Sequence, residues 1–199
     1  MSNPFPQLSP RLSVSFALTD DIDLNANFGR YAMQPSYTSM GYQAPDGTYP
    51  NKMRLKYIMS NQAVLGGEYH LGNYLHFSAE GFYKSYSSYP ISEIEGISLA
   101  SKGTEYGQVG AEAVLSTGEG RAYGAEVVAH LMPWHQFSAT ATYTLFRSEF
   151  TDKTGIYRPS SWDTRQMLNL LISYRMGKSW YLSASWRYSG GAPYTPIDM

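Results

Sequence analysis

The chain of 199 residues contains no cysteine, which excludes a disulfide framework and a cysteine-ligated zinc site. No apolar run is long enough for a membrane-spanning helix, and no segment shows a helical period. Charged residues make up only 16% of the chain, the net charge is -1, and no basic run suggests a nucleic-acid surface. Residues 1–6 lack the basic start and apolar middle of a secretory signal. If the protein is exported, we therefore expect its natural start to be missing from this sequence.

The chain is instead rich in aromatic residues and in segments where apolar and polar residues alternate. It has 18 Tyr, 8 Phe and 4 Trp. In residues 137–147, for example, Phe137 and Ala139 fall on one face of a strand and Ser138 and Thr140 on the other. The same alternation predicts about eight strands, at residues 11–18, 22–31, 62–71, 75–86, 121–131, 137–147, 165–176 and 180–189.

The connections between these strands alternate between short and long. Short turns are predicted at 19–21, 72–74, 132–136 and 177–179, and long polar loops at 32–61, 87–120 and 148–164. Short turns at one end and long loops at the other are typical of a transmembrane β-barrel. The hairpin pairings that place all apolar residues on one face are Leu18 with Ile22, Leu71 with Leu75, Leu131 with Phe137, and Met176 with Trp180. The sequence therefore predicts an all-β, antiparallel transmembrane barrel, with a soluble β-sandwich as the alternative.

Several segments, taken in order, resemble TonB-dependent outer-membrane receptors. Residues 80–86 resemble the family's E-x-F-Y-K-x-Y strand, 120–126 its GxAxGxE re-entry into the barrel, 161–165 its D-x-R start of a late strand, and 191–196 its GxPYTP segment. The resemblance implies a barrel of about 22 strands around an N-terminal plug domain. Neither the plug nor the family's final strands are recognisable between residues 1 and 199. We therefore expect residues 1–199 to be a partial barrel domain, an arc of consecutive strands.

The resemblance also implies a function and partners. Such a receptor lies in the bacterial outer membrane, in contact with its lipid, and imports a large, scarce nutrient such as a siderophore, glycan or peptide. A TonB-type protein supplies the energy by acting on the plug, and a surface lipoprotein is a further partner that such a receptor can have. Two alternatives stay open: a small stand-alone outer-membrane barrel acting as an adhesin or anchor, and a soluble β-sandwich binding module.

Aromatic residues in the long loops are the candidates for ligand contact. Rings at a barrel mouth can stack on sugars, siderophore rings or peptides. Packing between the loops is an equally good explanation of these residues. The candidates are Tyr37, Tyr42, Tyr49, Tyr89, Tyr157 and Trp162.

Polar residues on the predicted lumen face form the second candidate group. His70 and His76 should lie directly opposite each other, with Glu68 one step along, but we find no further ligand near them and expect no metal and no cofactor. No serine lies in a nucleophile elbow, so we do not expect an enzyme. The residues expected to face the lumen are Glu68, His70, His76, Glu80, Lys84, Glu126, Arg165, Asn169, Arg175 and Arg187.

Overall fold

The computed structural model describes residues 7–103 and 109–193. Residues 1–6, and the end of the 191–196 motif from Tyr194 onward, lie outside the described residues. Within the described part, no helix is long and apolar enough to cross a membrane. The elements are β1 (Arg11–Ala17), β2 (Ile22–Met33), α1 (Tyr37–Met40), β3 (Ile58–Leu71), β4 (Leu75–Ser92), β5 (Val114–Trp134), β6 (Phe137–Thr151), β7 (Tyr157–Pro159), β8 (Gln166–Met176) and β9 (Trp180–Ser189).

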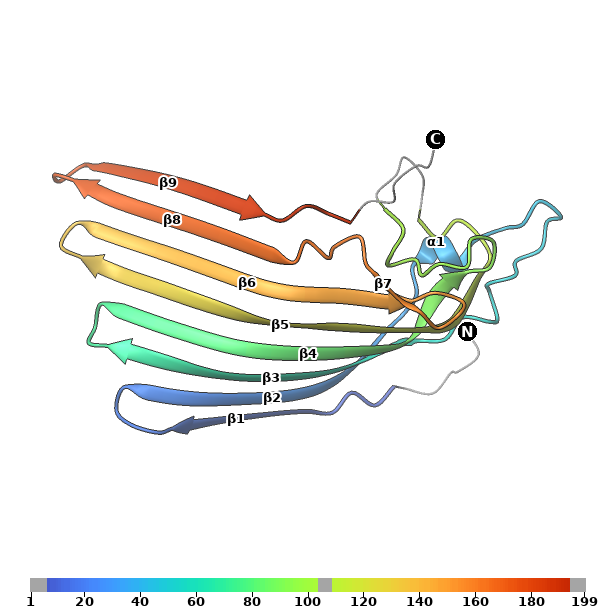
Figure 1. Ribbon diagram of the computed structural model, residues 1–199, viewed down its shortest axis with the longest axis horizontal. Helices are drawn as coiled ribbons and strands as arrows, with labels where there is room; N and C mark the ends of the chain where they lie inside the picture. The colour runs from blue at the N-terminus through green and yellow to red at the C-terminus, as the bar shows by residue number, and fades with distance from the viewer. Residues whose placement is uncertain (1–6, 104–108, 194–199) are drawn as a thin grey trace.

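The strands form a single antiparallel sheet, in which sequence neighbours are also spatial neighbours. The order is β1-β2-β3-β4-β5-β6-β8-β9, and the short β7 pairs with β6 beyond the start of β8. Short turns gather at one end of the sheet, and the loops and α1 at the other (Figure 1). Over the described residues, β1 and β9 are unpaired edges, so the sheet is an open arc. Neither a two-sheet sandwich nor a closed eight-stranded barrel fits this topology.

The central strands run further toward the loops than the alternation predicts. β4 ends at Ser92 rather than residue 86, and β5 begins at Val114 rather than 121. The ladder between them contains irregularities at Tyr86/Tyr89 and Tyr89/Pro90, and Ser88 has a φ of 59°. A bulge adds one residue to a strand and so interrupts the alternation of apolar and polar residues. For this reason the alternation did not predict the extension of β4 beyond residue 86.

Two short elements in the loops were not predicted. The helix α1 is one turn long, and its N-cap Ser36 accepts a hydrogen bond from the backbone N–H of Ser39 at 3.2 Å. The strand β7 has three residues. Neither is long enough to produce a recognisable period of apolar residues.

The turn between β5 and β6 is shorter than the five residues predicted. Trp134 pairs with Phe137, and Leu131 pairs with Ala139 rather than with Phe137. This pairing differs from the predicted one by two residues, so the face assignments stay correct even though the register was wrong. The pairings Leu71 with Leu75 and Met176 with Trp180 are confirmed.

The two faces of the sheet differ in chemistry. Side chains of one face hydrogen-bond across strands: Asn25 donates to Glu68 at 3.0 Å, and Thr144 donates to Glu126 at 2.7 Å. We call this the polar face and the other the apolar face. Large apolar side chains stand exposed on the apolar face, among them Leu12, Val14, Phe16, Leu24, Phe28, Leu65, Tyr83, Val127, Leu145, Ile172, Leu182 and Trp186.

The band of apolar residues crosses the sheet diagonally. The row of cross-strand partners that begins at Ile22 on β2 ends at Leu170 on β8. At the short-turn end, β2 starts at the apolar Ile22, whereas β8 stays apolar on this face up to Met176, six residues beyond Leu170. Six residues of about 3.3 Å, over five strand spacings of about 4.8 Å, correspond to a strand tilt of roughly 40°. Transmembrane barrels have strand tilts in this range.

Candidate functional site

A cavity of about 290 Å³ lies at the long-loop end of the sheet. Its wall combines residues from the ends of β2, β3 and β4 with Ser36 and Ser39 at α1 in the first long loop, and with residues of the loops that follow β4 and β7. Lys102 and three serines supply the polar side chains of the described lining. The apolar lining consists of Met33, Ile58, Tyr89, Pro90, Leu99, Val109 and Trp162.

Tyr89 belongs to an aromatic group that continues from this cavity along the polar face. The ring centroid of Phe150 lies 4.5 Å from that of Tyr89 and 5.3 Å from that of Tyr86. Because of the bulge at Ser88, Tyr86 and Tyr89 pair with Gly120 and Gly118, which are two residues apart on β5 and therefore share a face. A Cβ at Gly120 would lie 2.3 Å from a ring carbon of Phe150, so only glycine leaves room for this ring.

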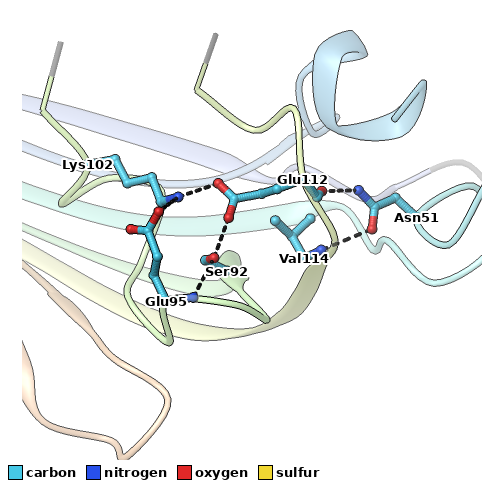
Figure 2. A network of polar contacts seen from close by, with 6 residues as sticks. All are labelled: Asn51, Ser92, Glu95, Lys102, Glu112 and Val114. Atoms are coloured by element: carbon cyan, nitrogen blue, oxygen red, sulfur yellow. Dashed lines mark hydrogen bonds and ion pairs between the residues drawn. The ribbon is translucent and has the colours of Figure 1, made fainter. Parts of the chain in front are cut away.

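A buried polar network joins the loops beside the cavity (Figure 2). Asn51 is fully buried and donates to the carbonyl oxygens of Ser39 at 2.8 Å and Glu112 at 2.7 Å. Its own side-chain oxygen accepts from the backbone N–H of Val114 at 3.0 Å. The side-chain amide of Asn51 therefore links the first long loop to α1 and to the start of β5.

The charged part of the network is centred on Lys102. Its ammonium pairs with Glu95 at 2.9 Å and with Glu112, whose carboxylate also accepts from the hydroxyl of Ser92. Burial lowers the pKa of Lys102, but the hydrogen bonds and charges of Glu112 and Glu95 outweigh it and raise the pKa overall. Lys102 is therefore held as a cation at the cavity wall, with its charge compensated by two carboxylates.

The cavity brings together two of the six aromatic residues expected to contact a ligand. Tyr89 and Trp162 both line it, and 57% of Trp162 is exposed. Tyr37, Tyr42 and Tyr49 lie elsewhere in the first long loop. Tyr157 lies on β7 with the guanidinium of Arg121 4.3 Å from its ring centre, and it does not line this cavity.

Most of the residues expected to face the lumen share the polar face. The exception is Arg165, which precedes β8, with a φ of 66°, so strand alternation does not fix its side. The other nine lie on strands, at positions that alternate with the apolar residues: Glu68, His70, His76, Glu80, Lys84, Glu126, Asn169, Arg175 and Arg187.

The histidines are more closely associated than the sequence indicated. His70 and His76 pair directly, with ring centroids 4.7 Å apart, and His130 of β5 pairs with His76 on its other side. Asp23 of β2 approaches His70 at 3.3 Å, a contact that we missed because it depends on the β2–β3 register. Among the described residues, no three such side chains are close enough to hold a metal ion.

Two carboxylates also meet across strands. Glu80 of β4 pairs directly with Glu126 of β5, on the polar face. This pair could not be predicted from the sequence, because the loop between the two strands is long and leaves their register undetermined. Placing the apolar residues of 75–86 and 121–131 on the same face leaves several possible registers, which differ from one another by two residues. The sequence does not distinguish between these registers.

An open, tilted, antiparallel arc with exposed apolar residues on one face and a hydrogen-bonded polar face defines the wall of a transmembrane β-barrel. The chain belongs to the TonB-dependent receptor family: the family model described as "TonB dependent receptor-like, beta-barrel" matches residues 2–198. Proteins of this family lie in the bacterial outer membrane. They are transport receptors.

Solved structures of transport receptors have the same fold. The ferric-catecholate import receptor Fiu from Escherichia coli K12 superposes with a TM-score of 0.64 at 14% identity, over 90% of this chain and 24% of that one. The copper transporter OprC superposes with a TM-score of 0.65 at 16% identity, over 91% of this chain and 25% of that one. The ferripyoverdine receptor of Pseudomonas aeruginosa superposes with a TM-score of 0.62 at 15% identity, over 92% of this chain and 22% of that one. The chain thus spans about a quarter of the length of these structures. No curated protein matches it.

Proposed function

We propose that this chain forms part of the barrel wall of a receptor that imports a large, scarce nutrient across the outer membrane. The observation that carries the proposal is the cavity at the long-loop end of the sheet, which is lined by both Tyr89 and Trp162. Aromatic side chains present large, rigid apolar surfaces to a ligand at a small cost in conformational entropy. The ligand classes that fit such a surface are siderophores, glycans and peptides.

The polar face is proposed to line the lumen. Its strands carry histidine, carboxylate and arginine side chains, which would be costly to place against hydrocarbon. The opposite face would contact outer-membrane lipid. A TonB-type protein would supply the energy through a plug domain inside the lumen, as the family name implies. A surface lipoprotein partner gains no support from the relatives named above, and we assign the chain no catalytic role.

The test uses the full-length receptor in cells and in purified form. Fluorescence of Trp162 is recorded while a ferric catecholate, an oligosaccharide or a peptide is added, and uptake of the compound that quenches it is then measured. Uptake should stop in cells treated with a protonophore and in cells lacking the TonB-type protein. Trp162→Ala and Tyr89→Ala should weaken binding by roughly tenfold each, as expected for loss of a stacking ring.

Tyr74→Ala is the control, since Tyr74 lies in the turn between β3 and β4, at the opposite end of the sheet from the cavity, and is 41% exposed. It should leave binding close to that of the unmodified receptor. Uptake that continues without the proton gradient would contradict an energy-dependent receptor. Equal losses in all three variants would mean that the cavity is not the binding site.

A further inference from the structure

The cavity at the long-loop end of the sheet has the size of one group of a larger ligand. Its volume is about 290 Å³. A protein cavity of roughly 150 Å³ holds a benzene molecule, whereas sites that enclose a whole drug-sized ligand measure roughly 300–1,000 Å³. The cavity therefore has room for one large side chain and the backbone beside it. A large nutrient would place only one of its groups there.

The three serines of the described lining are bonded within the protein. The hydroxyls of Ser36 and Ser39 lie 2.9 Å apart, and the Ser36 hydroxyl also accepts from the backbone N–H of Ser39 at 3.2 Å. The hydroxyl of Ser161 donates to the carbonyl oxygen of Ala100 at 3.2 Å. Ser39 is in addition fully buried. These serines therefore have few hydrogen bonds left to offer a ligand.

Lys102, the cation of the described lining, is also engaged by other residues (Figure 2). Its ammonium pairs with Glu95 at 2.9 Å and with Glu112. One ammonium and two carboxylates give this cluster a net charge of -1. An anionic group placed beside the cluster would find no uncompensated positive charge, so its burial would be unfavourable. The cavity is therefore poorly suited to a catecholate or a carboxylate.

Apolar side chains supply the contacts that remain for a ligand. Met33, Ile58 and Leu99 come from three separate segments and line the cavity together with Tyr89 and Trp162. A sugar carries hydroxyls around its ring, and burial in this lining would leave most of them without hydrogen-bond partners, which costs free energy. An aliphatic or aromatic side chain has no such groups, and its burial here is favourable. The lining therefore favours an uncharged apolar group.

We propose that the nutrient is a peptide and that the cavity takes one of its large apolar side chains, in contact with Tyr89 and Trp162. Of the three ligand classes, peptides present uncharged apolar side chains of this size, whereas ferric catecholates are anionic and glycans present hydroxyls. The inference rests on the proposed function, because it names the class of nutrient that the same cavity receives.

The experiment measures peptide binding to the full-length receptor, purified in detergent, by titration calorimetry. The probe is a capped pentapeptide with phenylalanine at its centre and glycine elsewhere. Its partner has alanine at the centre and is otherwise identical. The phenylalanine peptide should bind at least about tenfold more tightly, because its ring is buried in the cavity. Its heat-capacity change on binding should also be more negative, since burial of apolar surface has this signature.

Met33→Glu tests the same contact from the side of the protein. Met33 lines the cavity and is 59% exposed, so the variant places a carboxylate against the inserted side chain without burying it in the fold. The affinity for the phenylalanine peptide should fall by roughly tenfold. Met33→Leu, which keeps an apolar side chain, should retain the affinity. Met53→Glu is the matched control, because Met53 is 67% exposed in the first long loop and does not line the cavity.

Equal affinities for the two peptides would overturn the inference, and so would equal losses in Met33→Glu and Met53→Glu. Tighter binding of a ferric catecholate or an oligosaccharide, weakened by Met33→Glu, would also overturn it, but would leave energy-dependent import standing. Uptake that continues without the proton gradient would instead contradict the proposed function itself. The comparison of the two peptides uses the unmodified receptor, so it decides the matter even if Met33→Glu does not fold.

Discussion

The two ends of the sheet are held together by different means. At the short-turn end, the hairpins need little beyond the backbone ladder and a residue that accepts positive φ, such as Gly72 at 57° and Gly177 at 67°. At the long-loop end, order depends on particular buried side chains: Asn51, the Lys102 cluster, and Phe150 over Gly120. The membrane part therefore depends mainly on the alternation of apolar and polar residues, whereas the loop end depends on specific buried residues.

The largest effect is expected from a charge on the apolar face. Leu170→Arg would place a guanidinium near the middle of the apolar band, which costs about 2–4 kcal/mol in a bilayer. Asn169→Arg is the matched control, one residue away on the polar face. Folding of the full-length receptor into lipid vesicles, followed by denaturant titration, measures both. Similar stabilities would contradict the assignment of the two faces.

A large effect at the loop end is expected from Asn51→Ala. The substitution leaves two carbonyl groups and one N–H without their buried partner, at a cost of about 2–3 kcal/mol. The readout is the rate of limited proteolysis in the first long loop, which should rise. Gln43→Ala is the control, because that amide is exposed and donates only to the carbonyl of Gly47.

Gly120→Ala should have a moderate effect. The new methyl group would collide with the Phe150 ring, and relieving such overpacking costs about 1–3 kcal/mol. The thermal midpoint should fall, and the near-ultraviolet signal of the aromatic group should change. Gly191→Ala serves as the comparison, since no atom lies within 4 Å of a Cβ there. A change no larger than that of the comparison variant would count against the close Phe150 contact.

The smallest effect is expected from pH. The pKa of Lys102 is raised above its ordinary value of 10.5, so its contribution to stability is complete below that value and is lost only as the pH rises through the higher folded value. The carboxyl of Asp152 behaves in the opposite sense. Hydrogen bonds, chiefly from Thr154 and then from Arg158, lower its pKa below 3.8, so its contribution is present above that value and is lost as the pH falls further.

Protection of the loop amides should therefore be constant between about pH 5 and 9. Hydrogen exchange, corrected for its intrinsic pH dependence, tests this. Loss of protection near neutral pH would show that other groups control the loops.

Sequence patterns predicted the membrane part of this fold better than the loop end. Alternation located the strands, and the hairpins closed by Leu71 with Leu75 and Met176 with Trp180 followed from matching faces. The Glu80–Glu126 and His76–His130 pairs could not be predicted, because their register is set across a long loop. Asn51 gave no signal either, since its role depends on backbone groups that are remote in sequence.

The diagonal course of the apolar band means that hydrogen-bonded neighbours do not sit at equal heights in the bilayer. With a tilt of roughly 40° and strands about 4.8 Å apart, Ile22 and Leu170 differ in depth by about 15 Å, although one row of partners joins them. Probes attached along this row would thus sample hydrocarbon at graded distances from the surface.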